Sequence, residues 1–178
     1  MTFDVHYIFV ESAPSGDVTT WIAIAISILA LISTFWQGHL SRVHNKLSVR
    51  PQLEGHSQWD GRNYSLEVRN DGLGPAIITD ASVYHKSEKL DGEGPPLIEI
   101  AFKRIEFCNL MQHEFFYTPF ILPAGKAVNI FLVQYDEKIQ NIEAYLGELL
   151  RLEIEYESAY GEKLPTYKSR NPNKNKAA

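Results

Sequence analysis

Residues 18–36 read VTTWIAIAISILALISTFW, and this stretch decides how the rest of the chain is arranged. It contains no Lys, Arg, Asp, Glu, Pro or Gly. As an α-helix it would extend about 28 Å, close to the thickness of the hydrocarbon core of a bilayer. Trp21 lies near one end, and Phe35 and Trp36 lie at the other. Aromatic rings favour the headgroup level, so we predict a transmembrane helix over 18–36 with these three residues as interface anchors.

Three other interpretations of this stretch fit less well. A cleaved signal peptide has a basic N-terminal region, whereas Asp4, Glu11 and Asp17 precede the stretch without any Lys or Arg. The following residues, QGHLSRVHNK, offer no convincing cleavage site. A buried core helix of this length and a helix lying in the membrane interface would both need a polar face.

The flanking charges predict the orientation of the helix. Arg42, Lys46 and Arg50 follow it, and no basic residue precedes it. Because Lys and Arg stay on the cytoplasmic side, we expect a single-pass protein of the inner (plasma) membrane. Its N-terminus would lie outside, and the domain after the helix would be cytoplasmic.

One side of the helix carries small or polar residues at alternating spacings of three and four. They are Thr20, Ala23, Ser27, Ala30 and Thr34, and the pattern continues to Gln37 and Ser41. Small residues let two helix backbones approach closely within a bilayer. A seven-residue period suits a left-handed pair of helices, so we expect homo-oligomers through this face.

The rest of the chain has the composition of an ordinary folded domain. The 178 residues leave room for one domain beside the anchor, with 44% hydrophobic and 22% charged residues. The net charge of −5 gives no basic excess, so a nucleic-acid partner is not expected. Cys108 is the only cysteine and cannot form an internal disulfide. We interpret it as a small buried apolar residue rather than a reactive thiol.

Alternating strands separated by Gly and Pro turns dominate after Pro51. The predicted strands are 51–59, 64–70, 76–85, 126–135 and 151–158, with a short last strand near 164–167. The turn Asp60-Gly61-Arg62-Asn63 predicts a hairpin between the first two. Along the fifth strand, Leu152, Ile154 and Tyr156 are expected to face inward.

Two stretches between the strands have a different periodicity. Residues 97–111 fit either a helix or a strand, and the sequence leaves this open. Residues 137–150 have apolar residues at helical spacing, and Asp136 is the expected N-cap. The fold class we predict is mainly β: the N-terminal helix, then an antiparallel immunoglobulin-like β-sandwich with one or two short helices.

This reading divides the chain into five parts. They are an extracytoplasmic tail over 1–17, the transmembrane helix over 18–36, a juxtamembrane helix and linker over 37–50, the sandwich over 51–168 and a disordered basic tail over 169–178. The helix is expected to continue through 37–46 and to stop before Pro51.

Several turn and strand-edge motifs recur together. They are residues 44–51 (HNKLSVRP), 70–76 (NDGLGPA), 122–125 (LPAG), and Tyr156 with Tyr160-Gly161. With them the chain resembles a group of small, mostly uncharacterised bacterial single-pass membrane proteins that carry an immunoglobulin-like β-sandwich after the helix. The resemblance implies a fold, and it supplies no activity and no catalytic residues.

No motif predicts catalysis, a cofactor or a metal. The histidines lack the close spacing around a carboxylate that a helical zinc site has. Gly72-Leu73-Gly74-Pro75 precedes a strand rather than a helix, so it is a turn rather than a phosphate loop. Glu153, Glu155 and Glu157 share one strand face, which indicates a solvated surface. We therefore list no catalytic, cofactor or metal residues.

Two functions follow as hypotheses. The first is a membrane-anchored, non-enzymatic interaction module that presents a cytoplasmic β-sandwich to an unidentified protein partner. The second is a membrane-associated signalling effector or sensor whose β domain binds a small ligand such as a nucleotide. An enclosed polar pocket would favour the second.

Overall fold

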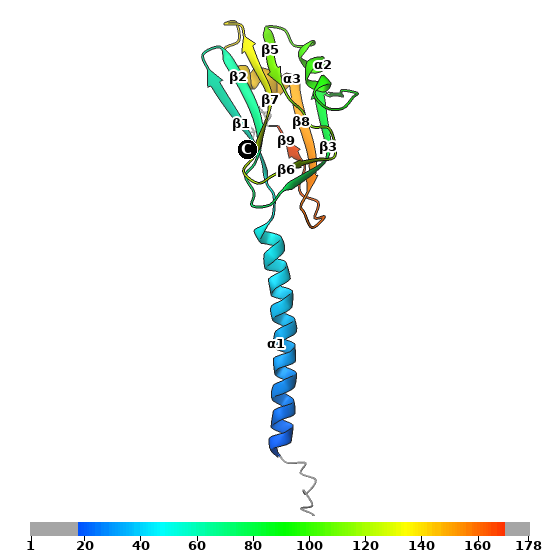
Figure 1. Ribbon diagram of the computed structural model, residues 1–178. Helices are drawn as coiled ribbons and strands as arrows, with labels where there is room; N and C mark the ends of the chain where they lie inside the picture. Colours follow the sequence, from blue (N-terminus) through cyan, green and yellow to red (C-terminus); the bar gives the residue numbers. More distant parts are fainter. Residues whose placement is uncertain (1–17, 170–178) are drawn as a thin grey trace, which may run out of the picture. The chain divides into compact units, whose positions relative to one another are not determined.

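The computed structural model describes residues 18–169, so the tail predicted over 1–17 and all but the first residue of the disordered tail predicted over 169–178 lie outside the described residues. That first residue, Ser169, is hydrogen-bonded to Leu152 in both directions, so the predicted start of the tail is wrong by one residue. Over these residues the fold is mainly β with antiparallel pairing and has three helices, the first of which is long and apolar (Figure 1). The predicted fold class is thereby confirmed, and the sheets are compatible with its immunoglobulin-like detail. The chain divides into two compact units, Met1–His44 and Asn45–Ala178, which are described separately below.

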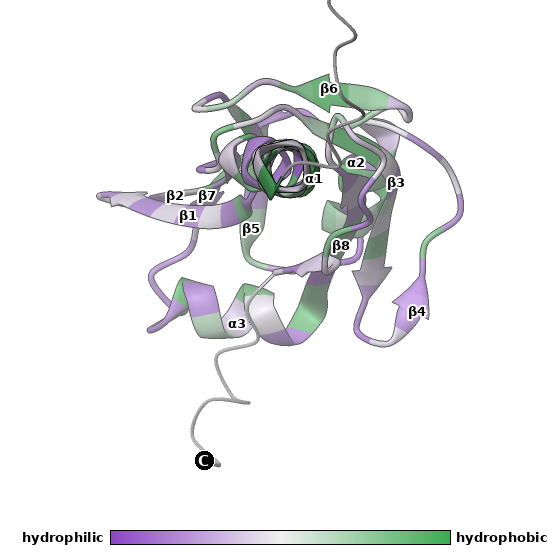
Figure 2. Ribbon diagram, turned by 90° about the horizontal axis from the view of Figure 1, so that it is seen from below, coloured by the Kyte–Doolittle hydropathy of each residue, from purple (hydrophilic) through white to green (hydrophobic). Residues whose placement is uncertain are grey.

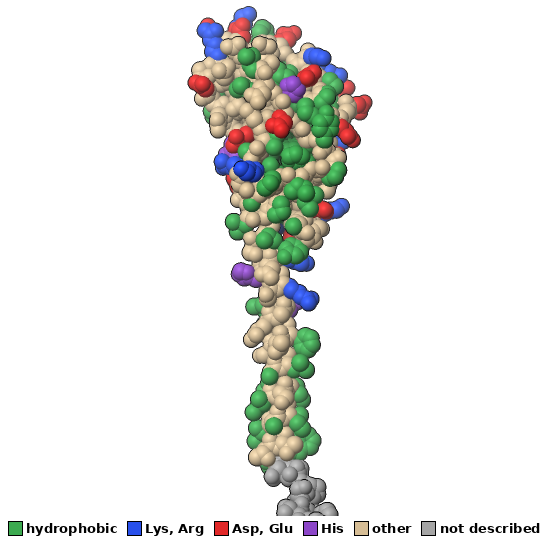
Figure 3. All heavy atoms as spheres, in the orientation of Figure 1, with side chains coloured by type: hydrophobic (Ala, Val, Ile, Leu, Met, Phe, Trp, Pro, Cys, Tyr) green, Lys and Arg blue, Asp and Glu red, His purple; other side chains and the backbone are tan. Residues whose placement is uncertain are grey.

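The helix α1 covers Val18–Ser48, and none of its 31 residues is buried. It is long and apolar enough to cross a membrane, judged by length and composition. Hydrophobic side chains cover its first part in the space-filling view (Figure 3). The helix continues past residue 36, as the sequence predicts, and ends just before Pro51, where proline disfavours helical geometry.

The first sheet has the strand order β1-β2-β7-β5. Its strands are β1 (Leu53–Asp60), β2 (Asn63–Asn70), β7 (Ala127–Tyr135) and β5 (Cys108–His113). The predicted hairpin is confirmed, because β1 and β2 pair in register from Leu53 with Asn70 to Asp60 with Asn63. The strands β1 and β5 form the two edges of this sheet.

The second sheet has the order β4-β3-β8-β9, with β6 pairing to the beginning of β3. Its strands are β3 (Ala76–His85), β4 (Glu88–Lys89), β6 (Phe120–Leu122), β8 (Leu150–Glu157) and β9 (Tyr167–Lys168). Leu152, Ile154 and Tyr156 of β8 are buried, as the alternation predicts.

Apolar residues from both sheets form one core between them. In Figure 2, β1, β2 and β7 lie on one side of the domain, and β3 and β8 lie on the other. Fully buried side chains come from both sheets and from the short helix α2 (Pro96–Phe102), among them Phe131, Ile78, Leu97, Ile98, Leu122, Ile130, Leu152 and Ile154. Burying each such side chain stabilises the fold by about 1.5 to 3 kcal/mol.

Two short helices complete the domain, α2 (Pro96–Phe102) and α3 (Ile142–Leu149). Residues 97–111, which the sequence leaves open between helix and strand, contain both, because the helix α2 is followed by the strand β5. The predicted N-cap Asp136 is wrong: Asn141 caps α3 by accepting a hydrogen bond from the Ala144 amide at 3.0 Å. Asp136 instead accepts from the Lys138 amide at 2.9 Å in the preceding turn.

Candidate functional site

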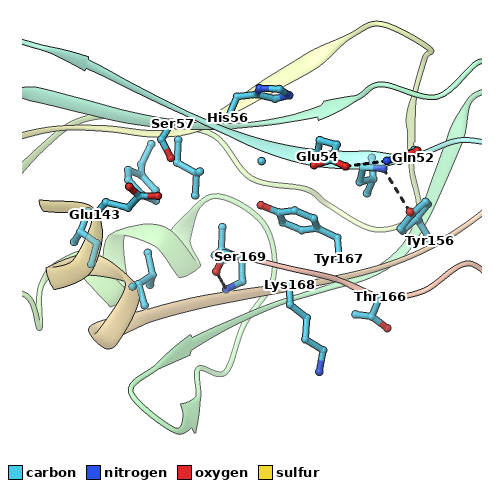
Figure 4. A pocket seen from close by; sticks show the side chains of 18 of the residues that line it. Gln52, Glu54, His56, Ser57, Glu143, Tyr156, Thr166, Tyr167, Lys168 and Ser169 are labelled. Carbon is cyan, nitrogen blue, oxygen red and sulfur yellow. Dashed lines mark hydrogen bonds between the residues drawn. The ribbon is translucent and has the colours of Figure 1, made fainter. Parts of the chain in front are cut away.

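A cleft of about 810 Å³ opens along one side of the β domain. One wall is the edge strand β1, and the opposite wall is the segment 164–169, which includes β9. Figure 4 shows β1 and this segment crossing the view on either side of the space, with α3 at one end. The cleft therefore lies where one edge of each sheet faces the other.

The floor of the cleft is apolar and comes from five elements. It is formed by Tyr64 and Leu66 of β2, Phe131 of β7, Leu146 of α3, Leu152 and Tyr156 of β8, and Leu53 of β1. These side chains are largely buried members of the core or pack against it. A ligand in the cleft would therefore rest on the exposed margin of the core.

The strand β1 turns the backbone groups of alternate residues toward the cleft side. A two-residue turn, with Gly61 at φ +59° in its first position, closes the hairpin at Asp60 and Asn63. In such a hairpin the closing pair exchanges hydrogen bonds, and alternate residues from there direct their N–H and C=O away from the partner strand. The outward residues are Leu53, Gly55, Ser57 and Trp59.

A contact of Leu53 agrees with this assignment. Its amide donates to the Tyr156 hydroxyl at 3.4 Å, across to the other sheet. At Gly55, a Cβ would overlap the Tyr167 hydroxyl, so this ring reaches from β9 to the β1 backbone. Figure 4 shows Tyr167 pointing from its strand toward β1. Ser57 and Trp59 thus present the open part of the edge.

Two cations border the cleft, and each has a carboxylate partner. Arg50 lies 3.3 Å from Glu162, and Lys168 lies 3.0 Å from Glu153. The hydrogen bond from Lys168 holds the pKa of the Glu153 carboxyl below its usual value. His56 lies 3.0 Å from Asp71, whose pKa is lowered first by Arg69 and then by His56.

Two other carboxylates at the cleft differ from Glu162 and Glu153 in having no ion-pair partner among the described residues. Glu54 accepts a hydrogen bond from Gln52 at 2.8 Å, and Glu143 lies in the first turn of α3. Among the described residues neither of them forms an ion pair. The cleft is therefore apolar below and weakly acidic at its rim.

Neither a metal-binding cluster nor an activated thiol accompanies this cleft among the described residues. No group of three or more His, Cys, Asp or Glu among them could hold a metal ion. Cys108 is half-buried away from the cleft, and burial raises the pKa of its thiol to about 11. A thiol with this pKa is almost entirely protonated near neutral pH and is a poor nucleophile.

The site residues predicted from the sequence lie on α1 or beside it. Thr20, Ala23 and Ser27 border a shallow groove along the helix, together with Ile24, Ile28 and Leu31. The hydroxyls of Ser27 and Thr34 donate to the carbonyls of Ala23 and Ala30, at 2.8 and 2.9 Å. Pairing through this face would therefore rest on close packing, with the hydroxyls already satisfied.

The other predicted residues are exposed. Trp21, Phe35 and Trp36 are 67%, 74% and 70% exposed, which suits side chains that meet lipid. Arg42 and Lys46 are exposed on α1, while Arg50 lies at the rim of the cleft. Of the predicted site residues in the described chain, Arg50 is the one that borders the cleft.

Sequence reasoning missed the cleft itself. Its walls come from β1 and from a two-residue strand more than a hundred residues later. One signal for it was present, because a glycine inside a strand marks the close approach of another group, and Gly55 has this position. The sequence does not identify Tyr167 as the group that approaches.

Comparison with known proteins identifies no family or function for this chain. The sequence matches no protein family, and no curated protein matches it.

Proposed function

We propose that the chain is a membrane-anchored, non-enzymatic interaction module whose β domain binds an extended segment of a partner protein by strand pairing along β1. The observation that carries the proposal is the open edge of β1, which borders an apolar-floored cleft. In strand addition, backbone groups of an exposed edge supply affinity and adjoining pockets supply specificity. The outward groups of Ser57 and Trp59 and the floor of the cleft would fill these two roles.

The anchor in this proposal is α1, with residues 18–36 in the inner membrane. Its apolar side chains are exposed throughout the described helix, and contiguous exposed apolar surface marks contact with lipid or protein. Arg42, Lys46 and Arg50 support a cytoplasmic β domain and an N-terminus outside. The small-residue face from Thr20 to Thr34 supports pairing of two copies within the bilayer.

The hypothesis of a small-ligand sensor has less support from the cleft. A nucleotide phosphate is held by available cations or by a ring of backbone amides at a helix N-terminus. Both cations at the cleft, Arg50 and Lys168, have carboxylate partners.

Photo-crosslinking in cells tests the proposal. A photoreactive residue at Gln58, on the open edge, should give a discrete adduct with a partner protein. The same residue at Thr79, exposed on the other sheet, serves as the control. Replacing Ser57 with proline should abolish the adduct at position 58, because it removes an outward amide that strand pairing needs. Equal adducts at both positions would contradict strand pairing at β1.

A further inference from the structure

The edge strand β1 lacks lysine, proline and bulges, three of the devices that keep natural edge strands from pairing. Edges are commonly blunted by lysine, proline or a bulge that prevents pairing with other strands. Over its eight residues, LEGHSQWD, β1 has no lysine, arginine or proline. Its pairing with β2 runs without a register shift. The edge is therefore open to pairing at Ser57 and Trp59, while the hydroxyls of Tyr156 and Tyr167 approach it at Leu53 and Gly55. The charges of β1 are Glu54 and Asp60.

These two carboxylates lie on the same face of β1. They belong to the alternate set Glu54, His56, Gln58 and Asp60, six positions apart, or about 20 Å along the strand. Both are exposed, and neither forms an ion pair within residues 18–169. A strand that pairs with β1 would place side chains beside both carboxylates, where opposite charges attract and like charges repel.

The same charges argue against a second copy of the chain as the occupant. Two β1 strands that pair antiparallel about Ser57 would place Glu54 of each copy opposite Asp60 of the other. Like charges directly opposite each other destabilise a pair of strands, and this pairing has two such contacts. Glu143, which lies at the cleft without an ion pair, adds negative charge on the cleft side.

We infer that the occupant of β1 is an extended peptide segment of a partner protein with lysine or arginine at positions six apart on one face. This inference rests on the proposed function and specifies its partner. The basic side chains would lie beside Glu54 and Asp60, and the residues between them would direct alternate side chains over the apolar floor. Complementary charge also selects against acidic segments, which would meet two repulsive contacts.

The test uses the purified full chain in uncharged detergent micelles. The probe is a labelled, capped peptide, Lys-Thr-Val-Thr-Val-Thr-Lys, and its twin has Glu in place of both Lys. Fluorescence anisotropy gives the affinity of each. Two exposed pairs worth about 0.2 to 1 kcal/mol each predict that the lysine peptide binds about 2- to 30-fold tighter than an uncharged equivalent. The glutamate peptide should bind more weakly still.

Charge reversal provides the decisive variants. Glu54→Lys with Asp60→Lys should invert the preference, so that the glutamate peptide binds tighter. The matched control, Asp91→Lys with Glu93→Lys, makes the same change in net charge in the loop after β4 and should leave the preference for lysine intact. Neither pair of substitutions alters a buried residue.

Ser57→Pro separates failure of this inference from failure of the proposed function. If both peptides bind equally and Ser57→Pro abolishes the binding of both, strand pairing at β1 stands and the inferred preference for a basic segment is overturned. If neither peptide shows binding that depends on Ser57, strand pairing at β1 is wrong, and the inferred preference for a basic segment is wrong as well. Ser57→Ala, which keeps the amide, should bind like the original chain.

Discussion

Asn70 is the buried polar residue that joins three parts of the β domain. Its side-chain oxygen accepts from the amides of Gln52 and Gly72, each at 3.1 Å. Its amide nitrogen donates to the carbonyls of Gly74 and Leu122, at 2.8 and 3.0 Å. The residue is fully buried, and its bonds to Gly74 and Leu122 are buried while those from Gln52 and Gly72 are partly buried. They hold the beginning of β1 against the turn after β2 and the end of β6.

We predict that Asn70→Ala destabilises the domain by about 3 kcal/mol. The substitution leaves two buried carbonyls and two partly buried amides without this partner, and each buried unsatisfied group costs about 1 to 3 kcal/mol before relaxation. Urea unfolding of the full chain, followed by circular dichroism of the strands, measures the change. Asn109→Ala on the exposed part of β5 is the control and should change the stability by less than about 0.5 kcal/mol. Equal effects would contradict the role of Asn70.

The ion pair between Glu153 and Lys168 predicts a dependence of stability on pH. Lys168 lowers the pKa of the Glu153 carboxyl, so the pair stabilises the fold above the ordinary carboxyl pKa of 4.5. This contribution is lost as the pH falls through the lowered pKa of the folded state. Because Lys168 is 60% exposed, we expect only about 0.2 to 1 kcal/mol.

The measurement is the difference in stability between the original chain and Glu153→Gln across this range of pH. The difference should be present at neutral pH and vanish in acid. Glu155→Gln, on the same strand and exposed, is the control and should show little difference at either pH. A difference for Glu153→Gln that persists in acid would mean that packing, rather than charge, is responsible.

At the scale of elements, the longer strands could be predicted, but the facing of their side chains could be predicted only where the alternation is clear. The strand β3 has the predicted bounds, 76–85, because its apolar residues and flanking turns are unambiguous. In β7 the simple alternation fails, since Ile130 and Phe131 are both buried. The pairing of β2 with β7 has an irregularity here, between Leu66 and Glu67, and an extra residue reverses the facing of those that follow.

The short strands β4 and β6 escaped prediction for a different reason, and for β9 the sequence predicts a short last strand near 164–167, whereas the structure has it at 167–168. The strands β4, β6 and β9 have two or three residues each, too few for a periodic pattern, and they exist because a neighbouring strand pairs with them. The strand β9 is one of these short strands, and it forms part of one wall of the cleft. The candidate site therefore depends on long-range pairing, which local sequence patterns do not encode.

Pairing of α1 through its small-residue face predicts a periodic crosslinking profile. With Cys108 replaced by serine, single cysteines along the helix should crosslink most at Ala23, Ser27, Ala30 and Thr34. A bulky residue such as Ala23→Ile or Ala30→Ile should weaken pairing, since each interhelical contact in a membrane is worth only about 0.6 to 2 kcal/mol. Ile24 and Ile28 lie off this face, and Ile24→Leu and Ile28→Leu leave the side-chain volume unchanged. Both variants should therefore pair normally. A profile without a period near 3.5 would exclude this mode of pairing.

At the scale of the whole molecule, retention of α1 decides whether the β domain is anchored. An apolar helix near the N-terminus can be either an anchor or a signal sequence. Residues 1–17 contain no lysine or arginine, unlike the basic N-terminal region of a signal peptide, and this favours an anchor. We predict that a chain with a different tag at each end keeps both tags and stays in the membrane fraction after carbonate and high-salt washes. Loss of the N-terminal tag from the mature chain would indicate cleavage.

Orientation is the last property that the charges around α1 predict. Arg42, Lys46 and Arg50 follow the apolar run, and residues 1–17 contain no lysine or arginine. Positive residues close to a span stay in the cytoplasm, so a reporter that is active only outside the cytoplasm should be silent when fused after Ala178. Replacing the three basic residues with glutamine and introducing Asp4→Lys and Glu11→Lys should invert the helix and activate the reporter.

The control for the three glutamine replacements removes the same number of basic residues far from the span, as in Lys86→Gln, Lys89→Gln and Lys103→Gln. Only charges near the ends of a span set its orientation, so the reporter should stay silent in this variant. Activity in the original chain would place the β domain outside the cytoplasm. The strand partner would then have to be an extracytoplasmic protein, and β1 would meet its basic segment on that side of the membrane.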